Sequence, residues 1–196
     1  MERKQIQEQR IRNYFIEATR EILKGEGLKS VNVRAIAERA GYSYATLYNY
    51  FKDIKELIFI CVQDFQKEAE ILINEKALSK PAGKERIREI AKDYIQYFTQ
   101  YPGIFDLFFL EKMVGISGKH PTAELIYTFL DRLTENDWNT CRELNLYSED
   151  QILTMKKQMN YSITGLLLMY MNRMHPQSYD LFIRDVDNQL SFVLDK

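Results

Sequence analysis

The sequence has few cysteines, histidines, prolines and glycines, and each shortage excludes a class of protein. Among 196 residues it contains two cysteines, two histidines, four prolines and eight glycines. Cys61 and Cys141 lie far apart in apolar surroundings, which is typical of buried free thiols and not of a disulfide framework. The histidines have no spacing to these cysteines that would build a zinc site. With so little proline and glycine, the abundant Leu, Ile, Glu, Lys, Arg and Gln favour helix over sheet.

Long apolar runs are also missing. The longest uncharged run, residues 158–172, has 15 residues and includes Asn, Gln, Ser and Thr. It falls short of the roughly 20 apolar residues that a membrane span requires. The first ten residues, MERKQIQEQR, are charged and lack the apolar core of a signal peptide. We therefore expect a soluble protein in the reducing cytoplasm.

The net charge is −1, but the charged residues are distributed unevenly along the chain. Residues 1–57 hold eleven Lys and Arg against eight Asp and Glu, whereas residues 58–196 hold sixteen against twenty. A mildly basic N-terminal part on an acidic body is compatible with binding to nucleic acid.

Apolar residues recur at helical spacing along most of the chain, and no segment alternates as a strand would. The pattern predicts an all-α protein of about nine helices, separated most clearly by loops at residues 79–84 and 115–121. The expected helices are 5–24, 33–40, 44–51, 54–76, 85–100, 102–114, 122–144, 148–174 and 178–194, and we expect Asp53 to cap the helix 54–76.

The second and third of these helices are short and are joined by a tight glycine turn. Asn32 is placed to cap the first of the two, and Gly41-Tyr42-Ser43 forms the turn. Two short helices joined in this way are the plan of a helix-turn-helix, whose second helix enters the major groove of DNA.

A helical wheel divides the side chains of the predicted helix 44–51 into two faces. Leu47, Tyr50 and Phe51 fall together and should pack inward. Ala45, Thr46 and Asn49 cluster on the opposite side, where they are able to meet base edges, and Tyr44 and Tyr48 flank the two faces. Arg34, at the start of the preceding helix, is placed to add a base or phosphate contact. The alternative is a small helical subdomain whose tyrosines are half-buried filler.

The stretch VNVRAIAERAGYSYATLYNYFKDIKELI resembles the DNA-binding region of the TetR family of bacterial transcriptional regulators. The likeness is specific over residues 11–57 and extends further only as length and helix layout. It implies a helix-turn-helix domain at 1–53 and a helical effector-binding and dimerisation domain at 54–196. The DNA-binding positions that it implies are Arg34, Ser43, Tyr44, Thr46, Tyr48, Asn49 and Tyr50, to which the wheel adds Ala45.

The sequence departs from the family pattern at three positions. Tyr44 stands where a small residue or a Lys or Arg is usual, so the operator sequence is not transferable. Ala35 replaces a usual acidic residue, at a cost of under ~1 kcal/mol in helix capping. Ile54 replaces a usual phosphate-binding lysine, and we expect Lys55, one position later, to take over that contact.

Aromatic residues of the C-terminal part are candidates for an effector pocket, since such pockets are mostly apolar. The alternative is that each of them belongs to the hydrophobic core. The candidates are Phe98, Phe105, Phe108, Phe109, Tyr127, Trp138 and Tyr161.

The last two predicted helices carry apolar stripes that could form a four-helix interface with a second copy, or could simply close the core. Gly165 would permit a close approach. The candidate interface residues are Met155, Met159, Ile163, Leu166, Tyr170, Phe182, Val186, Leu190 and Val193. The resemblance implies a homodimer, because two recognition helices must lie about 34 Å apart to meet successive turns of one groove face.

The leading hypothesis is thus an effector-responsive repressor that binds a palindromic operator as a homodimer. A second hypothesis is a co-regulator of the same fold that acts by binding a partner protein. An all-helical enzyme is the third, and the sequence shows no glycine-rich phosphate loop, metal cluster or nucleophile motif that would favour it. We expect no enzymatic activity, cofactor or metal.

Overall fold

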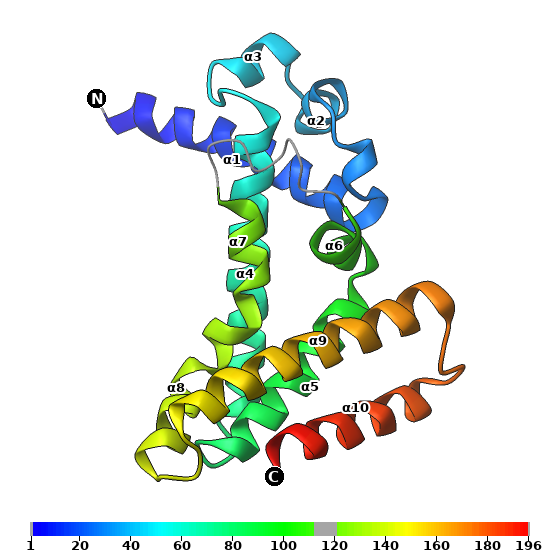
Figure 1. The fold of residues 1–196 in the computed structure, drawn as a ribbon. Coiled ribbons are helices and arrows are strands. Elements are labelled where there is room, and N and C mark those ends of the chain that lie inside the picture. Colours follow the sequence, from blue (N-terminus) through cyan, green and yellow to red (C-terminus); the bar gives the residue numbers. More distant parts are fainter. Residues whose placement is uncertain (1, 112–120, 196) are drawn as a thin grey trace. The chain divides into compact units, whose positions relative to one another are not determined.

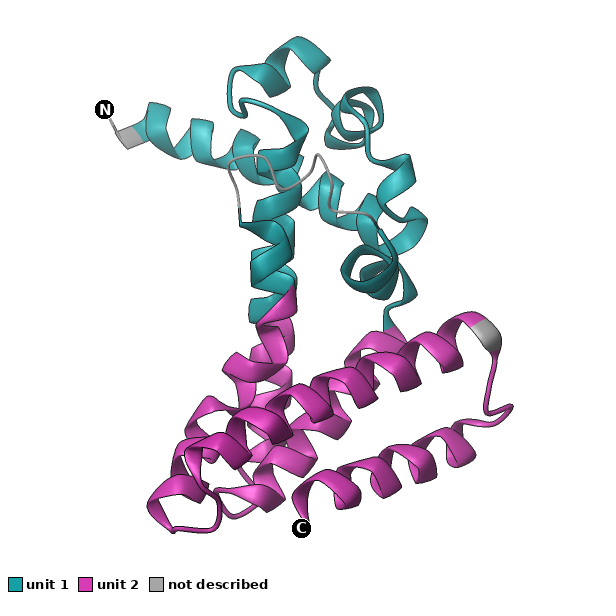
Figure 2. Ribbon diagram, in the orientation of Figure 1, with its two compact units in different colours: residues 1–67, 101–126 teal, residues 68–100, 127–196 magenta. Residues whose placement is uncertain are grey.

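The computed structural model describes residues 2–111 and 121–195, and this part of the chain contains ten α-helices and no strand (Figure 1). The predicted all-α fold is therefore confirmed. The chain divides into two compact units, one of residues 1–67 and 101–126 and the other of residues 68–100 and 127–196 (Figure 2). We call them unit 1 and unit 2.

Unit 1 contains the predicted helix-turn-helix. Its helices are α1 (Glu2–Glu26), α2 (Val33–Ala40), α3 (Tyr44–Tyr48), the first part of α4 (Ile54–Ala77), α6 (Pro102–Phe105) and most of α7 (Thr122–Tyr127). A short 3-10 turn (Leu28–Ser30) follows α1, and a π-helical turn (Asp106–Leu110) follows α6. The buried apolar side chains at its centre include Phe15, Ile22, Ile36, Leu47, Phe51 and Phe65.

Unit 2 is built from α5 (Lys84–Gln100), α8 (Phe129–Glu143), α9 (Glu149–Arg173), α10 (Tyr179–Leu194) and the end of α4. Helix α5 packs against α8, α9 and α10, and α9 packs along α10. The buried side chains at its centre include Ile90, Phe98, Phe129, Trp138, Met159 and Phe182.

Two predicted helices are not continuous α-helices in the structure, and a third, 44–51, already ends at Tyr48 as α3. The segment 122–144 is interrupted at Thr128, where ψ is 2°, so that α7 and α8 are separate helices. There the Thr128 hydroxyl accepts a hydrogen bond from Arg132 at 2.6 Å. The predicted helix 102–114 consists of α6 and the π-helical turn to Leu110, and its end lies outside the described residues, as does most of the loop 115–121.

Polar side chains begin the helices as the sequence predicts. Asn32 Oδ1 accepts hydrogen bonds from the backbone N–H groups of Arg34 at 3.1 Å and Ala35 at 3.0 Å. Asp53 accepts from the N–H of Glu56 at 2.9 Å. Each such cap contributes about 1 kcal/mol, so these local signals fix where α2 and α4 begin.

No helix in the described residues is long and apolar enough to cross a membrane. Among the same residues, no group of three or more His, Cys, Asp or Glu side chains could hold a metal ion.

Candidate functional site

The turn between α2 and α3 closes with backbone hydrogen bonds that require a left-handed residue. Gly41 has φ of 75° and ψ of 26°. The N–H of Tyr42 donates to the carbonyl of Ala37 at 3.0 Å, and that of Gly41 donates to the carbonyl of Glu38 at 3.1 Å. This is the pair of bonds of a Schellman motif, in which glycine avoids the strain of a side chain at positive φ. The turn therefore sets the angle at which α3 leaves α2.

The inner face of α3 is anchored in the core of unit 1. Leu47 is 0% exposed and Phe51, just beyond the helix, is 1% exposed. The Phe51 ring meets Phe15 of α1 edge-on with 6.3 Å between centroids, and the Arg12 guanidinium lies 4.9 Å from its centroid. The predicted packing face is thus correct for Leu47 and Phe51.

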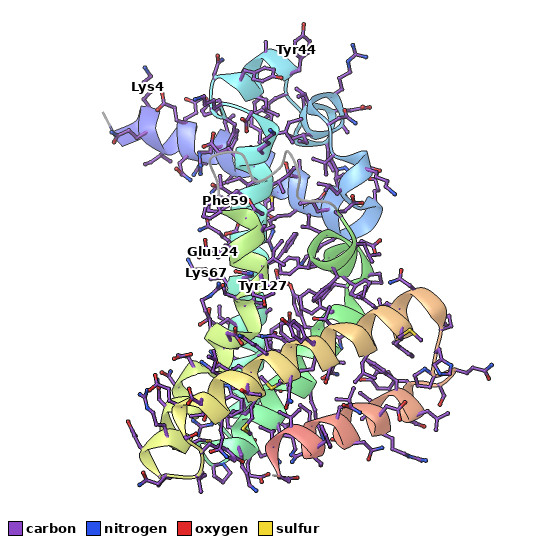
Figure 3. All side chains as sticks on the ribbon, in the orientation of Figure 1. Lys4, Tyr44, Phe59, Lys67, Glu124 and Tyr127 are labelled. Atoms are coloured by element: carbon purple, nitrogen blue, oxygen red, sulfur yellow. The ribbon has the colours of Figure 1, made fainter. Side chains whose placement is uncertain are left out.

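The outer face of α3 presents two large aromatic side chains to solvent. Tyr44 is 62% exposed and Tyr48 is 54% exposed, and Figure 3 shows Tyr44 projecting outward from α3. Ala45 and Asn49 beside them are exposed as well. Because burying a tyrosine ring is favourable, these two exposed rings on an anchored helix are available for contact with a partner.

Ser43 and Thr46 organise the start of this surface. The Ser43 hydroxyl caps α3 by accepting from the N–H of Thr46 at 3.1 Å, and the two hydroxyls lie 2.9 Å apart. Ser43 is exposed and Thr46 partly exposed. Each hydroxyl retains hydrogen-bonding capacity toward a ligand, because a hydroxyl has one proton and two lone pairs.

Tyr42 and Tyr50 differ from these exposed tyrosines. The Tyr42 ring lies 5.6 Å from the Phe15 centroid and 6.1 Å from that of Tyr14. The Tyr50 ring lies 6.3 Å from that of Phe15. Both side chains are partly buried. The alternative interpretation, in which the tyrosines are half-buried packing residues, therefore fits Tyr42 and Tyr50 but not Tyr44 and Tyr48.

Two of the predicted DNA-binding residues outside α3 are basic. Arg34 is exposed in the first turn of α2, and Lys55 is partly exposed in the first turn of α4. Within the described part of the chain, Lys55 forms no ion pair. Its ammonium is therefore available to an anionic partner.

An open groove of about 630 Å³ adjoins the end of α3, and no sequence pattern indicates it. It is lined by Asn49 and Tyr50 together with Gln5, Glu8, Gln9 and Arg12 of α1. Periodicity identifies the polar face of α1 but not what that face approaches. The groove adds polar α1 side chains to the surface next to Asn49.

The seven aromatic candidates for an effector pocket are divided between the units. Phe105, Phe108 and Phe109 belong to unit 1, where the Phe109 ring lies 5.3 Å from Phe105 and 6.5 Å from Phe108. Phe98, Tyr127, Trp138 and Tyr161 belong to unit 2.

The four candidates of unit 2 fall into two kinds. Phe98 and Trp138 are core residues at 0% and 1% exposure, and the Trp138 indole donates to the Thr134 hydroxyl at 3.2 Å. Tyr127 and Tyr161 are 61% and 64% exposed. Hydrogen bonding to the Tyr161 side chain raises the pKa of Tyr127.

Most of the candidate dimer residues lie in the core of unit 2. Seven are buried, and only Leu166 and Tyr170 are partly exposed. Tyr170 stacks on Phe182 with 4.2 Å between centroids and 8° between planes. The interpretation that these stripes close the core accounts for their burial, and α9 and α10 carry other apolar side chains on their outer faces. These include Tyr161, Met169, Leu181 and Phe192.

Comparison with known proteins adds a family match over the N-terminal part. Residues 15–59 match the family model of the bacterial regulatory proteins, tetR family. No curated protein matches the sequence.

Several solved structures share the fold over nearly the whole chain. The transcriptional regulator FadR of Bacillus subtilis, in complex with stearoyl-CoA, has a TM-score of 0.68 at 16% identity, with 92% of this chain and 96% of that one covered. A TetR transcriptional regulator from Rhodococcus sp. RHA1 has a TM-score of 0.63 at 15% identity, with 95% and 97% covered. The fatty acid degradation regulator FadR of Bacillus halodurans has a TM-score of 0.62 at 14% identity, with 94% of each chain covered.

These structures show a shared fold, and the family match covers both helices of the helix-turn-helix and the turn between them. Residues 15–59 therefore carry the helix-turn-helix module of the TetR family of bacterial regulatory proteins, and the predicted resemblance to that family is confirmed.

Proposed function

We propose that this protein regulates transcription by binding a palindromic DNA operator as a homodimer, and that a small-molecule effector controls this binding. The observation that carries the proposal is the outer face of α3. Tyr44 and Tyr48 are exposed on a helix that the buried Leu47 anchors, within the segment that matches the family model.

The outer face of α3 has the chemistry to read a major groove. Asn49 is suited to pair with adenine, and Ala45 and the methyl group of Thr46 are suited to contact thymine methyls. The hydroxyls of Ser43, Tyr44, Tyr48 and Tyr50, together with Arg34 and Lys55, would position the helix by contacts to phosphate. Positioning contacts give affinity, whereas the base contacts give sequence preference.

Fluorescence anisotropy with duplex DNA from the region upstream of the gene tests this assignment at two salt concentrations. We expect binding that weakens with salt, with a slope of about −0.9 for each phosphate neutralised. Asn49→Ala should relax the preference for one base at a cost of about 1–3 kcal/mol. Glu135→Ala, an exposed position of α8 in unit 2, is the matched control and should bind as the wild type does.

The alternative is a co-regulator that acts through a partner protein, favoured by the presence of Ile54 where a phosphate-binding lysine is usual. Absence of any salt-dependent DNA binding in the same titration would contradict the leading proposal and support this one.

We propose that the second copy packs against the outer faces of α9 and α10. Tyr161 and Met169 of α9 are 64% and 47% exposed, and Leu181 and Phe192 of α10 are 44% and 64% exposed. Gly165 lies between the first two and has no atom within 4 Å of where a Cβ would stand. In this arrangement the exposed side chains contact the second copy. The buried apolar side chains of α9 and α10 pack the two helices together within one chain.

The division of roles that we propose assigns DNA binding to residues 1–53, and effector binding and dimerisation to residues 54–196. Helix α4 begins in unit 1 and ends in unit 2, which supports a role for it as the link between them. An effector acts only through different affinities for two states. We propose that binding shifts α4 and changes the separation of the two DNA-binding heads, and unchanged DNA affinity with bound effector would contradict this.

A structure of similar fold suggests the first effector to test. One structure of similar fold holds stearoyl-CoA, which makes a long-chain acyl-CoA the first compound to test. Thermal shift is a suitable assay, since a ligand at 100 times its dissociation constant adds about 2.7 kcal/mol of stability.

A further inference from the structure

The first turns of α1 form a helical segment whose side chains stay in solvent. Residues 3–10 are all exposed, and the core of unit 1 begins only at Phe15. A short, mostly polar helix that buries no side chain is marginal in water, because helices in proteins gain most of their stability from packing. The core of unit 1 therefore does not require this segment. The family match begins at residue 15, so the segment also lies outside the matched helix-turn-helix module.

Residues 2–12, which we call the N-terminal segment, carry most of the basic excess of the N-terminal part of the chain. The segment holds four Lys and Arg against two Glu, whereas residues 13–57 hold seven against six. Lys4 Nζ lies 4.0 Å from the Glu8 carboxylate. The other three basic side chains of the segment form no ion pair with any described residue. Their positive charge is therefore available to an anionic partner.

The groove of about 630 Å³ connects the N-terminal segment to the end of α3. One helical face of the segment lines this groove together with Asn49 and Tyr50, since residues three and four positions apart share a face. The α1 residues of this face are Gln5, Glu8, Gln9 and Arg12. Figure 3 shows Lys4 of α1 and Tyr44 of α3 projecting toward the same side of unit 1. The segment therefore continues the surface that α3 presents to DNA in the proposed function.

The groove offers hydrogen-bond donors suited to phosphate oxygens. Glutamine amides and arginine guanidinium groups are among the side chains that proteins use for phosphate contacts. Gln9 donates to Asn13 Oδ1 at 2.9 Å and has a second amide proton to offer. The Arg12 guanidinium lies 4.9 Å from the Phe51 ring centroid, which holds it beside the end of α3. At 1.5 Å per residue the segment is about 16 Å long, enough to follow several phosphates of one DNA strand.

We propose that the N-terminal segment is a second DNA-binding element, which holds the phosphate backbone in the groove beside the bases that α3 contacts. Gln5, Gln9 and Arg12 donate hydrogen bonds to phosphate oxygens, and Lys4 adds a positive charge next to them. Such contacts add affinity for any duplex and no sequence preference. The inference rests on the proposed DNA binding and extends it to contacts outside the helix-turn-helix.

Two substitutions at neighbouring positions of α1 test the groove contact. Gln5→Glu places a negative charge in the groove, so it should weaken binding to the upstream duplex about tenfold in fluorescence anisotropy. Ile6→Glu is the matched control, because it makes the same change in charge one residue later. Ile6 is exposed and does not line the groove, since it lies about 100° around the helix from Gln5. Ile6→Glu should therefore weaken binding much less.

The dependence of binding on salt tests the contribution of Lys4. Lys4→Gln should reduce the magnitude of the slope of log affinity against log salt by about 0.9 for each subunit bound. Lys67→Gln is the matched control, because it removes the same charge from an exposed position of unit 1. Lys67 lies about 18 Å along α4 from Lys55, so its removal should leave the slope unchanged.

An unrelated duplex separates positioning from base recognition. Gln5→Glu should weaken binding to the upstream and the unrelated duplex by the same factor, whereas Asn49→Ala should change the preference between them. The inference would be overturned if Gln5→Glu and Ile6→Glu bound equally well, or if Lys4→Gln left the salt slope unchanged. Both results would leave the proposed function standing, as long as the wild type binds DNA in a salt-dependent manner. A wild type without such binding would overturn the proposed function and this inference together.

Discussion

At the scale of single residues, the proposed DNA-binding surface depends on which side chains of a short helix remain in water. Leu47 and Tyr48 are neighbours in sequence, yet one is 0% exposed and the other 54% exposed. The buried leucine holds the helix in place, and the exposed tyrosine has a hydroxyl to offer to a phosphate. The same division separates the two exposed tyrosines, Tyr44 and Tyr48, from Tyr42 and Tyr50, which pack on α1.

Lys55 is the residue on which phosphate binding at the start of α4 should depend, since Ile54 cannot supply a charge. We predict that Lys55→Ala reduces the magnitude of the slope of log affinity against log salt by about 0.9 for each subunit bound. Ile54→Lys should increase it by a similar amount. Titration of the operator complex by anisotropy at several salt concentrations measures both, and an unaltered slope in Lys55→Ala would remove this lysine from the interface.

Asp93 and Asp195 should give opposite dependences of stability on pH. Burial raises the pKa of Asp93 above its ordinary value of 3.8, although Lys76 opposes this. Partial burial acts to raise the pKa of Asp195 too, but Lys84 and Arg88 hold it below 3.8. The native state thus binds a proton at Asp93 more tightly than the unfolded chain does, and at Asp195 less tightly.

The contribution of Asp93 to the free energy of unfolding therefore increases as the pH falls toward 3.8. The contribution of Asp195 is present above pH 3.8 and is lost as the pH falls through its lowered pKa. We predict that, from about pH 7 to pH 4, the wild type gains stability relative to Asp93→Asn. Below about pH 5 it should lose stability relative to Asp195→Asn. Melting temperatures of the three proteins across this range measure both differences, and parallel curves would contradict the prediction.

At the scale of elements, α6 packs closely on the end of α1 at Gly103. Among the described glycines, Gly103 leaves the least space for a Cβ atom. A Cβ on Gly103 would stand 2.4 Å from the carbonyl oxygen of Leu23 and 2.5 Å from that of Lys24. Nearby, Lys24 Nζ lies 5.0 Å from the ring centroid of Tyr101, just before α6. Helix α6 is therefore fixed on α1 by backbone atoms that cannot move aside.

Gly103→Ala tests this contact, because helix propensity and packing predict opposite effects. Propensity alone would stabilise the variant by about 1 kcal/mol. The overlap with two carbonyl oxygens should instead destabilise it by about 1–3 kcal/mol. Gly25→Ala in α1 is the matched control, since its Cβ would meet no atom within 4 Å, and it should be neutral or stabilising. Urea unfolding at one protein concentration measures both, and a stabilised Gly103→Ala would contradict the contact.

At the scale of the whole molecule, the proposed dimer depends on apolar side chains that the chain itself leaves exposed. Tyr161 is among the most exposed of these at 64%. Because a charge buried without a partner is costly, one acidic substitution in such a row should prevent association while leaving the fold of the chain intact.

We predict that the wild type has about twice the chain mass of 23.3 kDa in solution, and that Tyr161→Glu has a mass near that of one chain. Light scattering coupled to gel filtration measures this. Leu144→Glu is the control, because Leu144 is 61% exposed at the end of α8 and lies outside α9 and α10. Loss of the dimer should also reduce operator affinity, and a dimeric Tyr161→Glu would place the interface elsewhere.

The sequence alone determined the features that depend on a few neighbouring residues. These are the all-α fold, the caps at Asn32 and Asp53, the turn at Gly41, and the opposite faces of α3, because helical periodicity and cap chemistry act over one or two turns. Only the tertiary structure decided what each apolar face is buried against. An amphipathic pattern has the same form whether Met159 and Val186 meet their own chain or a partner, and it cannot distinguish the buried Phe98 from the exposed Tyr161. The groove between α1 and the end of α3 and the close approach at Gly103 likewise arise from contacts between segments distant in sequence, which no local pattern encodes.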